Sequence, residues 1–277
     1  MAVITISRGI KSRGEELAKC LAQRLGYEAI SHEVLTECAK KYNILESDLL
    51  DELEETPSLW QKLTKERSRQ LIYIKCTLLE IVKRDNVIYY GHAGQVLLAG
   101  LNNVMKLRLE APLEVRINAV MREFNVNREE ASAYIKNLDE QRRRWIKFLY
   151  DEDWHDPLLY DLSMNLQNMS LDTICDIVKV AVNSQEFRTT PQSVQRLINV
   201  SLACEVQAAI AADDKLWDQP ITVSANDGVV LLKGTAKNNS MRDLVVETAA
   251  QVKGVKKCDV RIGLLTDPVP KGKYGHE

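Results

Sequence analysis

The chain has 277 residues, 45% of them hydrophobic, which is enough to bury one large core or two smaller ones, and the usual domain size favours two. Lysine and arginine number 37 against 39 aspartate and glutamate, so the net charge is only -2. No overall field then draws the molecule toward nucleic acid or an anionic bilayer, and any phosphate site has to be local.

Neither a secretion signal nor a membrane span is expected. In MAVITISRGIKSRGEEL a short apolar run precedes the basic residues, the reverse of a secretory signal, and no later run is long enough to cross a membrane. We therefore expect a cytoplasmic protein. The cysteines are widely spaced without a C-x-x-C pair, so reduced core residues are expected, with no metal site and no disulfide. They are Cys20, Cys38, Cys76, Cys175, Cys204 and Cys258.

The first 183 residues alternate predicted strands and helices. Residues 3–6 form a β-branched run typical of a buried strand, and a polar loop from Ser7 to Gly14 separates it from a helix that Gly26 ends. Further strands are expected at 87–90 and 105–109, the second alternating with Lys106 and Arg108, and helices at 34–42, 71–82, 112–124, 127–144 and 171–182. Asn127 with Glu130 resembles a capping box, and Ser170 is expected to cap the last helix. Short helices in a mobile insertion are expected between Glu46 and Glu66. This alternation predicts an α/β domain with a parallel sheet flanked by helices over residues 1–183.

A second, smaller α+β domain is expected over residues 197–265. Residues 184–196 contain Ser, Thr and Pro without apolar periodicity and are interpreted as a linker. A helix from Val194 to Ala212, a hairpin turning at Asn226-Asp227-Gly228, a helix over 241–252 and a strand over 258–264 are predicted. Residues 266–277 are expected to form a flexible tail.

The loop after the first strand is a candidate phosphate site. A glycine-rich turn between a strand and a helix binds phosphate because backbone N–H groups and the helix N-terminus converge on the anion. The pattern G-x-x-x-x-G-K-[ST] is met at Gly9 and Gly14 and fails at Glu15 and Glu16. On this segment alone, an ordinary turn between strand and helix is the simpler interpretation.

Five segments together resemble the cytidylate kinase-like family in order and spacing, over about residues 1–183. They are ITISR at 4–8, ELA at 16–18, VIYYG at 87–91, APLEVRI at 111–117 and DWHDPLLYDL at 153–162. The resemblance implies a P-loop nucleoside monophosphate kinase-like fold, with ATP phosphates on the first loop, Mg²⁺ as the metal and an arginine-bearing lid. It covers the whole first domain, and the last two segments are its most specific part.

The resemblance also assigns residues to the site. The phosphate loop would use Arg8, Gly9, Lys11, Ser12, Arg13 and Gly14, the lid would supply Arg142, Arg143 and Arg144 as catalytic residues, and His92, Asp161 and Asn165 would lie near the substrate. Guanidinium groups suit a transferring phosphoryl group because they bind two oxygens at once and stay charged. The alternative is a solvated helix face for the arginines and local caps for Asp161 and Asn165.

Three positions depart from the family pattern. Where the family loop reads Gly-Ser-Gly-Gly-Arg-Glu, this chain has KSRGEE at 11–16, so two glycines gain side chains and a basic position becomes acidic. Gly91-His92-Ala93 stands in place of Gly-Arg-Gly, which exchanges an arginine for a weaker, titrating cation. Ser31-His32-Glu33 replaces Asp-Lys-Glu and loses a carboxylate and an ammonium group.

The second domain resembles a BON domain through DGVVLLKG at 227–234 and VKGV at 252–255. This implies a module that binds a ligand, a membrane surface or another protein, or that drives oligomerisation. Three functions stay open for the whole chain: an ATP-dependent phosphotransferase acting on a nucleotide or related small phosphorylated ligand, a catalytically inactive nucleotide- or ligand-binding regulator, and a scaffold without a small ligand. Glu15 and Glu16 favour the second.

Overall fold

The computed structural model describes residues 2–49 and 65–265. The central part of the predicted insertion, at 50–64, and the predicted tail at 266–277 lie outside the described residues. Contacts divide the chain into two compact units, one of Met1–Leu63 with Thr77–Leu197 and the other of Thr64–Cys76 with Ile198–Glu277.

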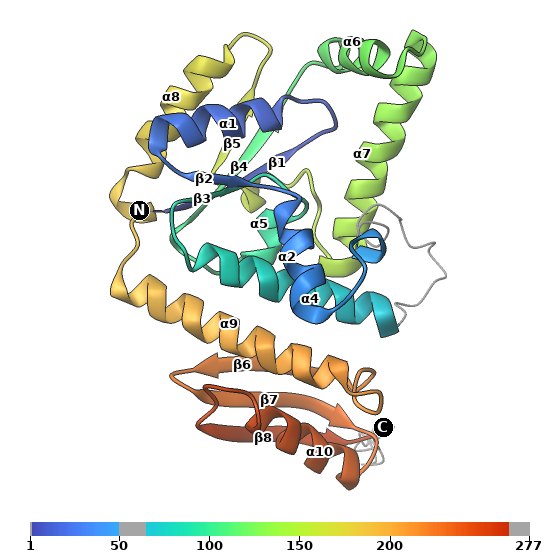
Figure 1. The fold of residues 1–277 in the computed structure, drawn as a ribbon, viewed down its shortest axis with the longest axis vertical. Helices are drawn as coiled ribbons and strands as arrows, with labels where there is room; N and C mark the ends of the chain where they lie inside the picture. Colours follow the sequence, from blue (N-terminus) through green and yellow to red (C-terminus); the bar gives the residue numbers. More distant parts are fainter. Residues whose placement is uncertain (1, 50–64, 266–277) are drawn as a thin grey trace, which may run out of the picture. The chain divides into compact units, whose positions relative to one another are not determined.

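The first unit is built on a five-stranded parallel sheet, which confirms the predicted α/β fold (Figure 1). The strand order is β2-β3-β1-β4-β5. The strands are β1 (Val3–Arg8), β2 (Glu28–Ile30), β3 (Val87–Tyr89), β4 (Val104–Glu110) and β5 (Leu162–Asn165). The central β1 is buried over almost its whole length, as expected for a strand that helices cover on both faces.

Helices α1 and α8 lie over one face of this sheet, and α2 and α5 lie over the other (Figure 1). The helices of this unit are α1 (Gly14–Leu25), α2 (Glu33–Tyr42), α5 (Gly94–Leu97), α6 (Leu113–Phe124), α7 (Arg128–Tyr150) and α8 (Leu171–Val182). A further helix, α4 (Lys65–Val82), contributes residues to both units. The 3-10 turns η1 (Pro157–Leu159) and η2 (Gln185–Phe187) complete the connections.

Helix ends follow the predicted capping residues. The Asn127 side chain accepts from the backbone of Glu130, whose carboxylate binds back to the Asn127 N–H, so a complete capping box starts α7. The hydroxyl of Ser170 caps α8, and Gly26 ends α1 in the left-handed conformation. These local signals explain why the starts of α7 and α8 and the end of α1 were readable from the sequence, whereas α7 runs on to Tyr150, past the predicted end at 144.

The expectation of six reduced cysteines is wrong for four of them. The structure joins Cys20 of α1 to Cys175 of α8, and Cys76 of α4 to Cys204. Cys38, which is buried, and Cys258 are free. The bonded partners stand 155 and 128 residues apart, so only the packing of the helices brings them together.

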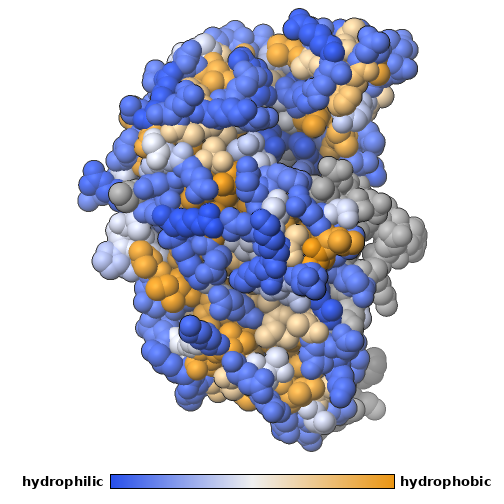
Figure 2. Space-filling view, in the orientation of Figure 1, coloured by the Kyte–Doolittle hydropathy of each residue, from blue (hydrophilic) through white to orange (hydrophobic). Residues whose placement is uncertain are grey.

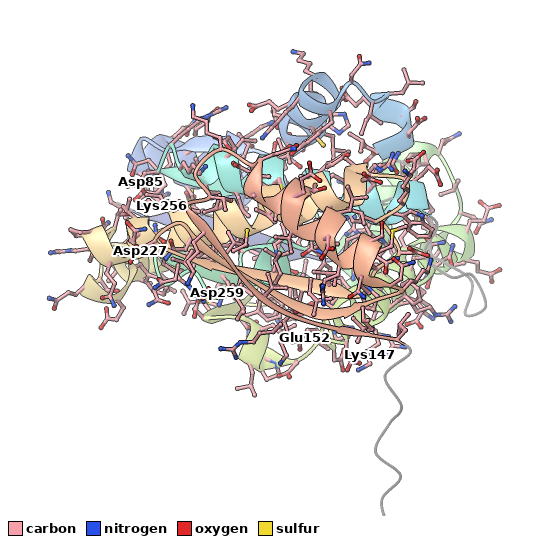
Figure 3. All side chains as sticks on the ribbon, turned by 90° about the horizontal axis from the view of Figure 1, so that it is seen from below. Asp85, Lys147, Glu152, Asp227, Lys256 and Asp259 are labelled. Carbon is pink, nitrogen blue, oxygen red and sulfur yellow. A yellow bond between two sulfur atoms is a disulfide. The ribbon has the colours of Figure 1, made fainter. Side chains whose placement is uncertain are left out.

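The second unit holds a three-stranded mixed sheet with two helices, which confirms the smaller α+β domain. Its elements are α9 (Pro191–Ala212), β6 (Ile221–Asn226), β7 (Val229–Ala236), α10 (Asn239–Ala250) and β8 (Lys257–Leu264). The hairpin of β6 and β7 is antiparallel, and β8 pairs with β7 in parallel. The Lys256 N–H donates to Gly228 O at 2.8 Å, and Figure 3 shows Asp227 and Lys256 at the same end of the sheet.

This unit has an apolar core of its own. Leu202, Val206 and Ile210 recur every fourth residue along α9 and face the sheet. The sheet and α10 complete the core with Leu216, Ile221, Val230, Leu232, Ala236, Val245, Ala249 and Ile262.

Helix α9 starts inside the predicted linker. Thr190 and Ser193 exchange hydrogen bonds between side chain and backbone, and Pro191 takes the first helical position. Such a cap starts a helix without apolar periodicity, which is why the pattern placed the start three residues later. The division between the compact units falls within this helix, between Leu197 and Ile198.

The face shown in Figure 2 is mostly hydrophilic, with hydrophobic side chains scattered between the charged ones. Across residues 2–49 and 65–265, no helix combines the length and the apolar character that crossing a membrane requires.

Candidate phosphate site

The candidate loop lies between the carboxyl end of β1 and the start of α1, at the edge of a parallel sheet where ligands usually bind. Lys11 has a φ of 56° and Arg13 a φ of 62°. Both therefore stand in the left-handed conformation that favours glycine. The loop keeps a glycine-type backbone although glycine is absent at these two positions.

Four charged side chains of the loop and of the first turn of α1 have partners of opposite charge: Lys11, Arg13, Glu15 and Glu16. Lys11 Nζ donates to Glu123 Oε1 at 2.7 Å, and Arg13 Nη2 lies 2.6 Å from Glu16 Oε2. Glu15 pairs with Lys19 on the next turn of α1. Glu15, which stands at the family's basic position, and Glu16 are thus paired within the chain, and so are Lys11 and Arg13.

A pocket of about 380 Å³ lies over this loop. Its cationic lining consists of Arg8, Lys11, Arg13 and Arg142, and its acidic lining of Glu15, Glu16 and Glu123. The structure therefore brings the predicted loop residues and one predicted lid arginine into one pocket. The Ser12 side chain is buried, and its hydroxyl has no hydrogen-bond partner among the described residues.

Arg8, Arg142 and His92 meet in a smaller pocket beside the loop. Arg8 Nη1 donates to Gly91 O at 3.2 Å, and Arg142 Nη1 donates to Arg8 O at 3.2 Å. Burial and the charge of Arg142 lower the pKa of Arg8 to about 10. Trp145 and Trp154 form the aromatic wall of this pocket.

His92 is neutral at physiological pH. Burial, and then the guanidinium groups of Arg142 and Arg8, lower the pKa of His92 to about 3. The interpretation of His92 as a weaker, titrating cation in place of the family's arginine is therefore wrong. A neutral imidazole beside two arginines avoids a third positive charge in a partly desolvated place.

The lid arginines divide into two groups. Arg142 reaches the loop, whereas Arg143 and Arg144 donate to the two carboxylate oxygens of Glu140 on the same helix. The Arg144 side chain is 65% exposed. Only Arg142 therefore lines either pocket, and the other two fit the alternative of a solvated helix face.

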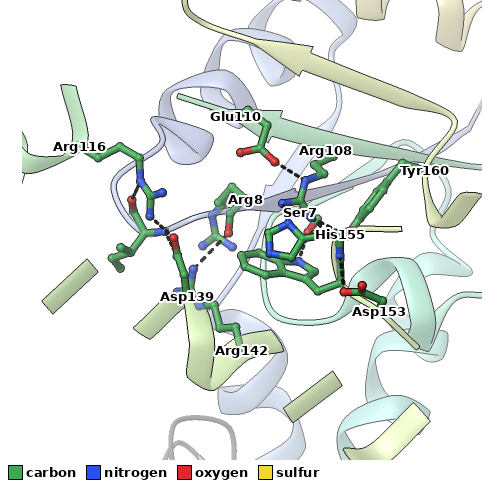
Figure 4. A network of polar contacts seen from close by, with 12 residues as sticks. Ser7, Arg8, Arg108, Glu110, Arg116, Asp139, Arg142, Asp153, His155 and Tyr160 are labelled. Atoms are coloured by element: carbon green, nitrogen blue, oxygen red, sulfur yellow. Dashed lines mark hydrogen bonds and ion pairs between the residues drawn. The ribbon is translucent and has the colours of Figure 1, made fainter. Parts of the chain in front are cut away.

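The DWHDP segment packs beneath the end of β1. Trp154 Nε1 donates to Ser7 Oγ at 2.8 Å, and Tyr160 OH donates to Trp154 O at 2.9 Å. The buried Arg108 stacks over Trp154 at 4.7 Å and binds His155 Nδ1 at 3.0 Å, as Figure 4 shows beside the loop contacts. This segment supports the residue that precedes the phosphate loop.

Asp161 and Asn165 have local partners. Asp161 Oδ2 accepts from the backbone N–H of Lys106 at 2.7 Å, and Asn165 Oδ1 accepts from that of Gln167 at 2.8 Å. Neither residue belongs to the lining of the two pockets. These contacts match the local alternative, and the substrate role of both residues stays a prediction.

Sequence reasoning missed a clamp on Ile10. Arg116 Nε donates to Ile10 O at 2.7 Å, and the Ile10 N–H donates to Asp139 Oδ1 at 3.0 Å. Arg116 and Asp139 also form an ion pair (Figure 4). The sequence contains one signal for this contact. Arg116 lies within APLEVRI at 111–117, where the apolar periodicity of a helix predicts a buried side chain.

The loop fits a phosphate chain through its left-handed backbone, its cations and the pocket above it. For Mg²⁺, Glu16 stands where the P-loop pattern has Ser or Thr, and its oxygens are suitable ligands that Arg13 now engages. No group of three or more His, Cys, Asp or Glu in the described part of the chain is placed to hold a metal ion. Mg²⁺ commonly keeps waters and substrate phosphates as ligands, so one or two carboxylates suffice.

The geometry agrees with sequence comparison, because residues 3–168 match the cytidylate kinase-like family and residues 200–263 match the BON domain. The chain belongs to the cytidylate kinase-like family. The cytidylate kinase of Pyrococcus furiosus is 28% identical over 182 residues, which cover 65% of this chain and 88% of that protein. The cytidylate kinase of Haloarcula marismortui is 27% identical over 184 residues, covering 66% of this chain and 90% of that protein.

A solved structure supports the same fold. An uncharacterized protein from Eubacterium ventriosum superposes with a TM-score of 0.50 at 20% identity, over 67% of this chain and 100% of that one. In this chain, the part that matches the BON domain follows the part that matches the cytidylate kinase-like family.

Proposed function

We propose that the chain transfers a phosphoryl group from ATP, with Mg²⁺, to a nucleoside monophosphate or a related small phosphorylated acceptor. The observation that carries this proposal is the pocket over the loop, where Arg8, Lys11, Arg13 and Arg142 meet at the carboxyl edge of a parallel sheet. Phosphoryl transfer depends mainly on positioning and on charge stabilisation, and four cations supply the latter.

Within this proposal, each part has one role. The loop backbone binds the phosphates of ATP, and Arg142 stabilises the charge that spreads over the transferring group. Arg8 lies between the two pockets and lines both. The acceptor then enters on the side of His92, whose neutral ring donates or accepts a hydrogen bond without adding charge.

The ion pairs of the loop favour a second candidate function. Lys11 and Arg13 are bound by Glu123 and Glu16, so a phosphate has to displace a carboxylate before either cation can serve it. A chain in which carboxylates compete with phosphate for these cations binds nucleotide weakly and turns it over poorly. A regulatory protein needs only the binding. The alternative is therefore a catalytically inactive, nucleotide- or ligand-binding regulatory protein.

We further propose that the BON domain tethers the kinase-like domain to a partner, or binds a ligand and transmits that binding to the kinase-like domain. Its partner is a small ligand, a membrane surface, another protein or a second copy of the chain.

A cytoplasmic location is part of the proposal because the donor is ATP. The two disulfides belong to oxidising conditions, so the thiol state of the protein in freshly lysed cells is the direct check on this location.

Calorimetric titration with ATP–Mg²⁺, followed by a coupled assay over the nucleoside monophosphates, separates the candidates. Binding with turnover of one acceptor supports the phosphotransferase. Binding with defined stoichiometry but without turnover on the whole panel supports the regulator. No heat from a folded, monodisperse sample would sink both and leave a scaffold.

A further inference from the structure

Ile10 is held at both of its backbone polar groups by side chains from two other helices. Its carbonyl accepts from Arg116 Nε on α6 at 2.7 Å, and its N–H donates to Asp139 Oδ1 on α7 at 3.0 Å. Arg116 is only 8% exposed and forms an ion pair with Asp139. Ile10, Arg116 and Asp139 thus contact one another in a closed ring. Its hydrogen bonds involve charged side chains and are stronger than those between neutral groups.

The side chain of Ile10 is anchored in the same place. It packs against the small apolar core between α6 and α7, formed by Ile117, Val120, Ala131 and Ile135. The loop is therefore attached to these two helices by apolar burial as well as by hydrogen bonds. Neither kind of contact depends on a bound phosphate.

The neighbouring residue, Gly9, lies close against Arg116. A Cβ added at Gly9 would lie 2.9 Å from Arg116 Nη2, closer than real contacts allow. On the other side of Gly9, Arg142 Nη1 donates to Arg8 O. Asp139 and Arg142 stand three residues apart on α7, so one helix face binds the loop on both sides of Gly9.

We propose that Arg116 and Asp139 are positioning residues that fasten the phosphate loop to α6 and α7, so that loop and lid form one preassembled piece before nucleotide binds. The proposal rests on the phosphate site proposed above. The contacts of Arg116 and Asp139 with Ile10 then hold Arg142 beside the phosphate loop, so no closing movement of the lid is needed to bring it there. The conformational entropy that the arginine loses on being ordered near the phosphate is then lost during folding, and nucleotide binding is not weakened by it.

Three variants separate this role from general stability. Asp139→Ala removes the acceptor of the Ile10 N–H and the partner of the buried Arg116. Asp139→Asn keeps an oxygen for the Ile10 N–H but loses the negative charge. Arg128→Ala is the matched control, because it breaks the exposed ion pair with Glu114 that joins the same two helices away from the loop.

The first measurement is amide hydrogen exchange followed by mass spectrometry, without ligand. In Asp139→Ala, peptides covering residues 8–14 should exchange at least about tenfold faster, which corresponds to the loss of one charge-assisted hydrogen bond. Peptides from β4 and α8 should be unchanged. Asp139→Asn should lie between Asp139→Ala and the parent, and Arg128→Ala should match the parent.

The second measurement is titration with ATP–Mg²⁺, together with kcat and KM for any accepted acceptor. Asp139→Ala should weaken ATP binding about tenfold or more and lower kcat, since Arg142 loses its place. Loop exchange that stays at the parental rate in folded Asp139→Ala overturns the fastening. Faster exchange with parental affinity and kcat overturns the positioning role.

The two proposals fail separately. A folded parent that binds no ATP–Mg²⁺ sinks the proposed function, while the exchange comparison still decides whether loop and lid are fastened. If Asp139→Ala does not fold, the comparison of Asp139→Asn with Arg128→Ala decides, because both retain the shape of α7. Equal loop exchange in these two variants counts against the proposal.

Discussion

Arg142 and Arg8 are joined by a hydrogen bond of 3.2 Å from a guanidinium to a backbone carbonyl, and both line the two pockets of the site. Their neighbours Arg143 and Arg144 instead share Glu140 on the surface of α7. We therefore expect Arg142→Ala to lower kcat about 100-fold, the usual cost of removing one group that stabilises transition-state charge. Arg143→Ala and Arg144→Ala should keep nearly parental kcat in the same coupled assay. A loss shared evenly among the three variants, at equal thermal midpoints, would refute this division of roles.

The loop should accept the family sequence without strain. Lys11 and Arg13 occupy left-handed conformations, where glycine is favoured by about 1 kcal/mol per residue. The variant with Lys11→Gly, Arg13→Gly and Glu15→Arg should bind ATP–Mg²⁺ more tightly by calorimetry and unfold at a denaturant concentration no lower than the parent. The double variant that retains Glu15 separates backbone from charge. Unchanged affinity in the folded triple variant would show that the loop does not limit nucleotide binding.

The number of reactive thiols tests the two disulfides directly. Unfolded without reductant, the oxidised protein should react at two thiols, those of Cys38 and Cys258, and after reduction at six. In the folded protein Cys38 should react slowly because burial raises the pKa of its thiol to about 11. Reduction should lower the thermal midpoint, since a disulfide that closes a long loop stabilises by about 2–4 kcal/mol. Six reactive thiols in unfolded, unreduced protein would exclude both bonds.

The second domain should fold on its own. Every side chain of its apolar core lies within residues 197–265, from Leu202 to Ile262. A fragment of these residues with Cys204→Ser, which removes the thiol left without Cys76, should show a cooperative thermal transition and dispersed amide signals. A fragment that melts without cooperativity would indicate that residues Thr64–Cys76, which share this compact unit, are needed.

His92 should make the protein sensitive to acid. Its folded pKa of about 3 lies below its unfolded value of 6.5, so the unfolded chain binds the extra proton between these values. Stability is then present above pH 6.5 and is lost as the pH falls through this window. Between about pH 7 and pH 5, the parent should lose about 2 kcal/mol more than His92→Gln in urea unfolding. Parallel losses in both proteins would contradict a His92 that stays neutral in the folded protein.

Strong local patterns predicted most of the fold. The β-branched run at 3–6, the alternation of apolar residues with Lys106 and Arg108 over 105–109, and the capping box of Asn127 are read from neighbouring residues. All three are confirmed. Strand β5 was missed because its four residues, LSMN, are short and half polar at the edge of the sheet. Edge strands show weak periodicity because only part of each face is buried.

The site was predicted less completely, since its contacts join residues far apart in the chain. The loop residues and Arg142 are indicated by sequence, but the partner of Ile10 is a carboxylate 129 positions away. In the sequence, Asp139 belongs to a long run of charged helix residues and resembles any solvated side chain. Its role depends on the tertiary packing of α7, which no local pattern encodes.

The attachment of Ile10 separates the shape of the loop from its chemistry. In an ordinary phosphate loop, glycines supply both the backbone conformation and the open space around the anion. Here the conformation is supported from outside, by a side chain seated between α6 and α7 and by Arg116 and Asp139. Charges at positions 11, 13 and 15 can therefore be exchanged without collapsing the loop, which makes this chain a suitable scaffold for altering what its phosphate site accepts.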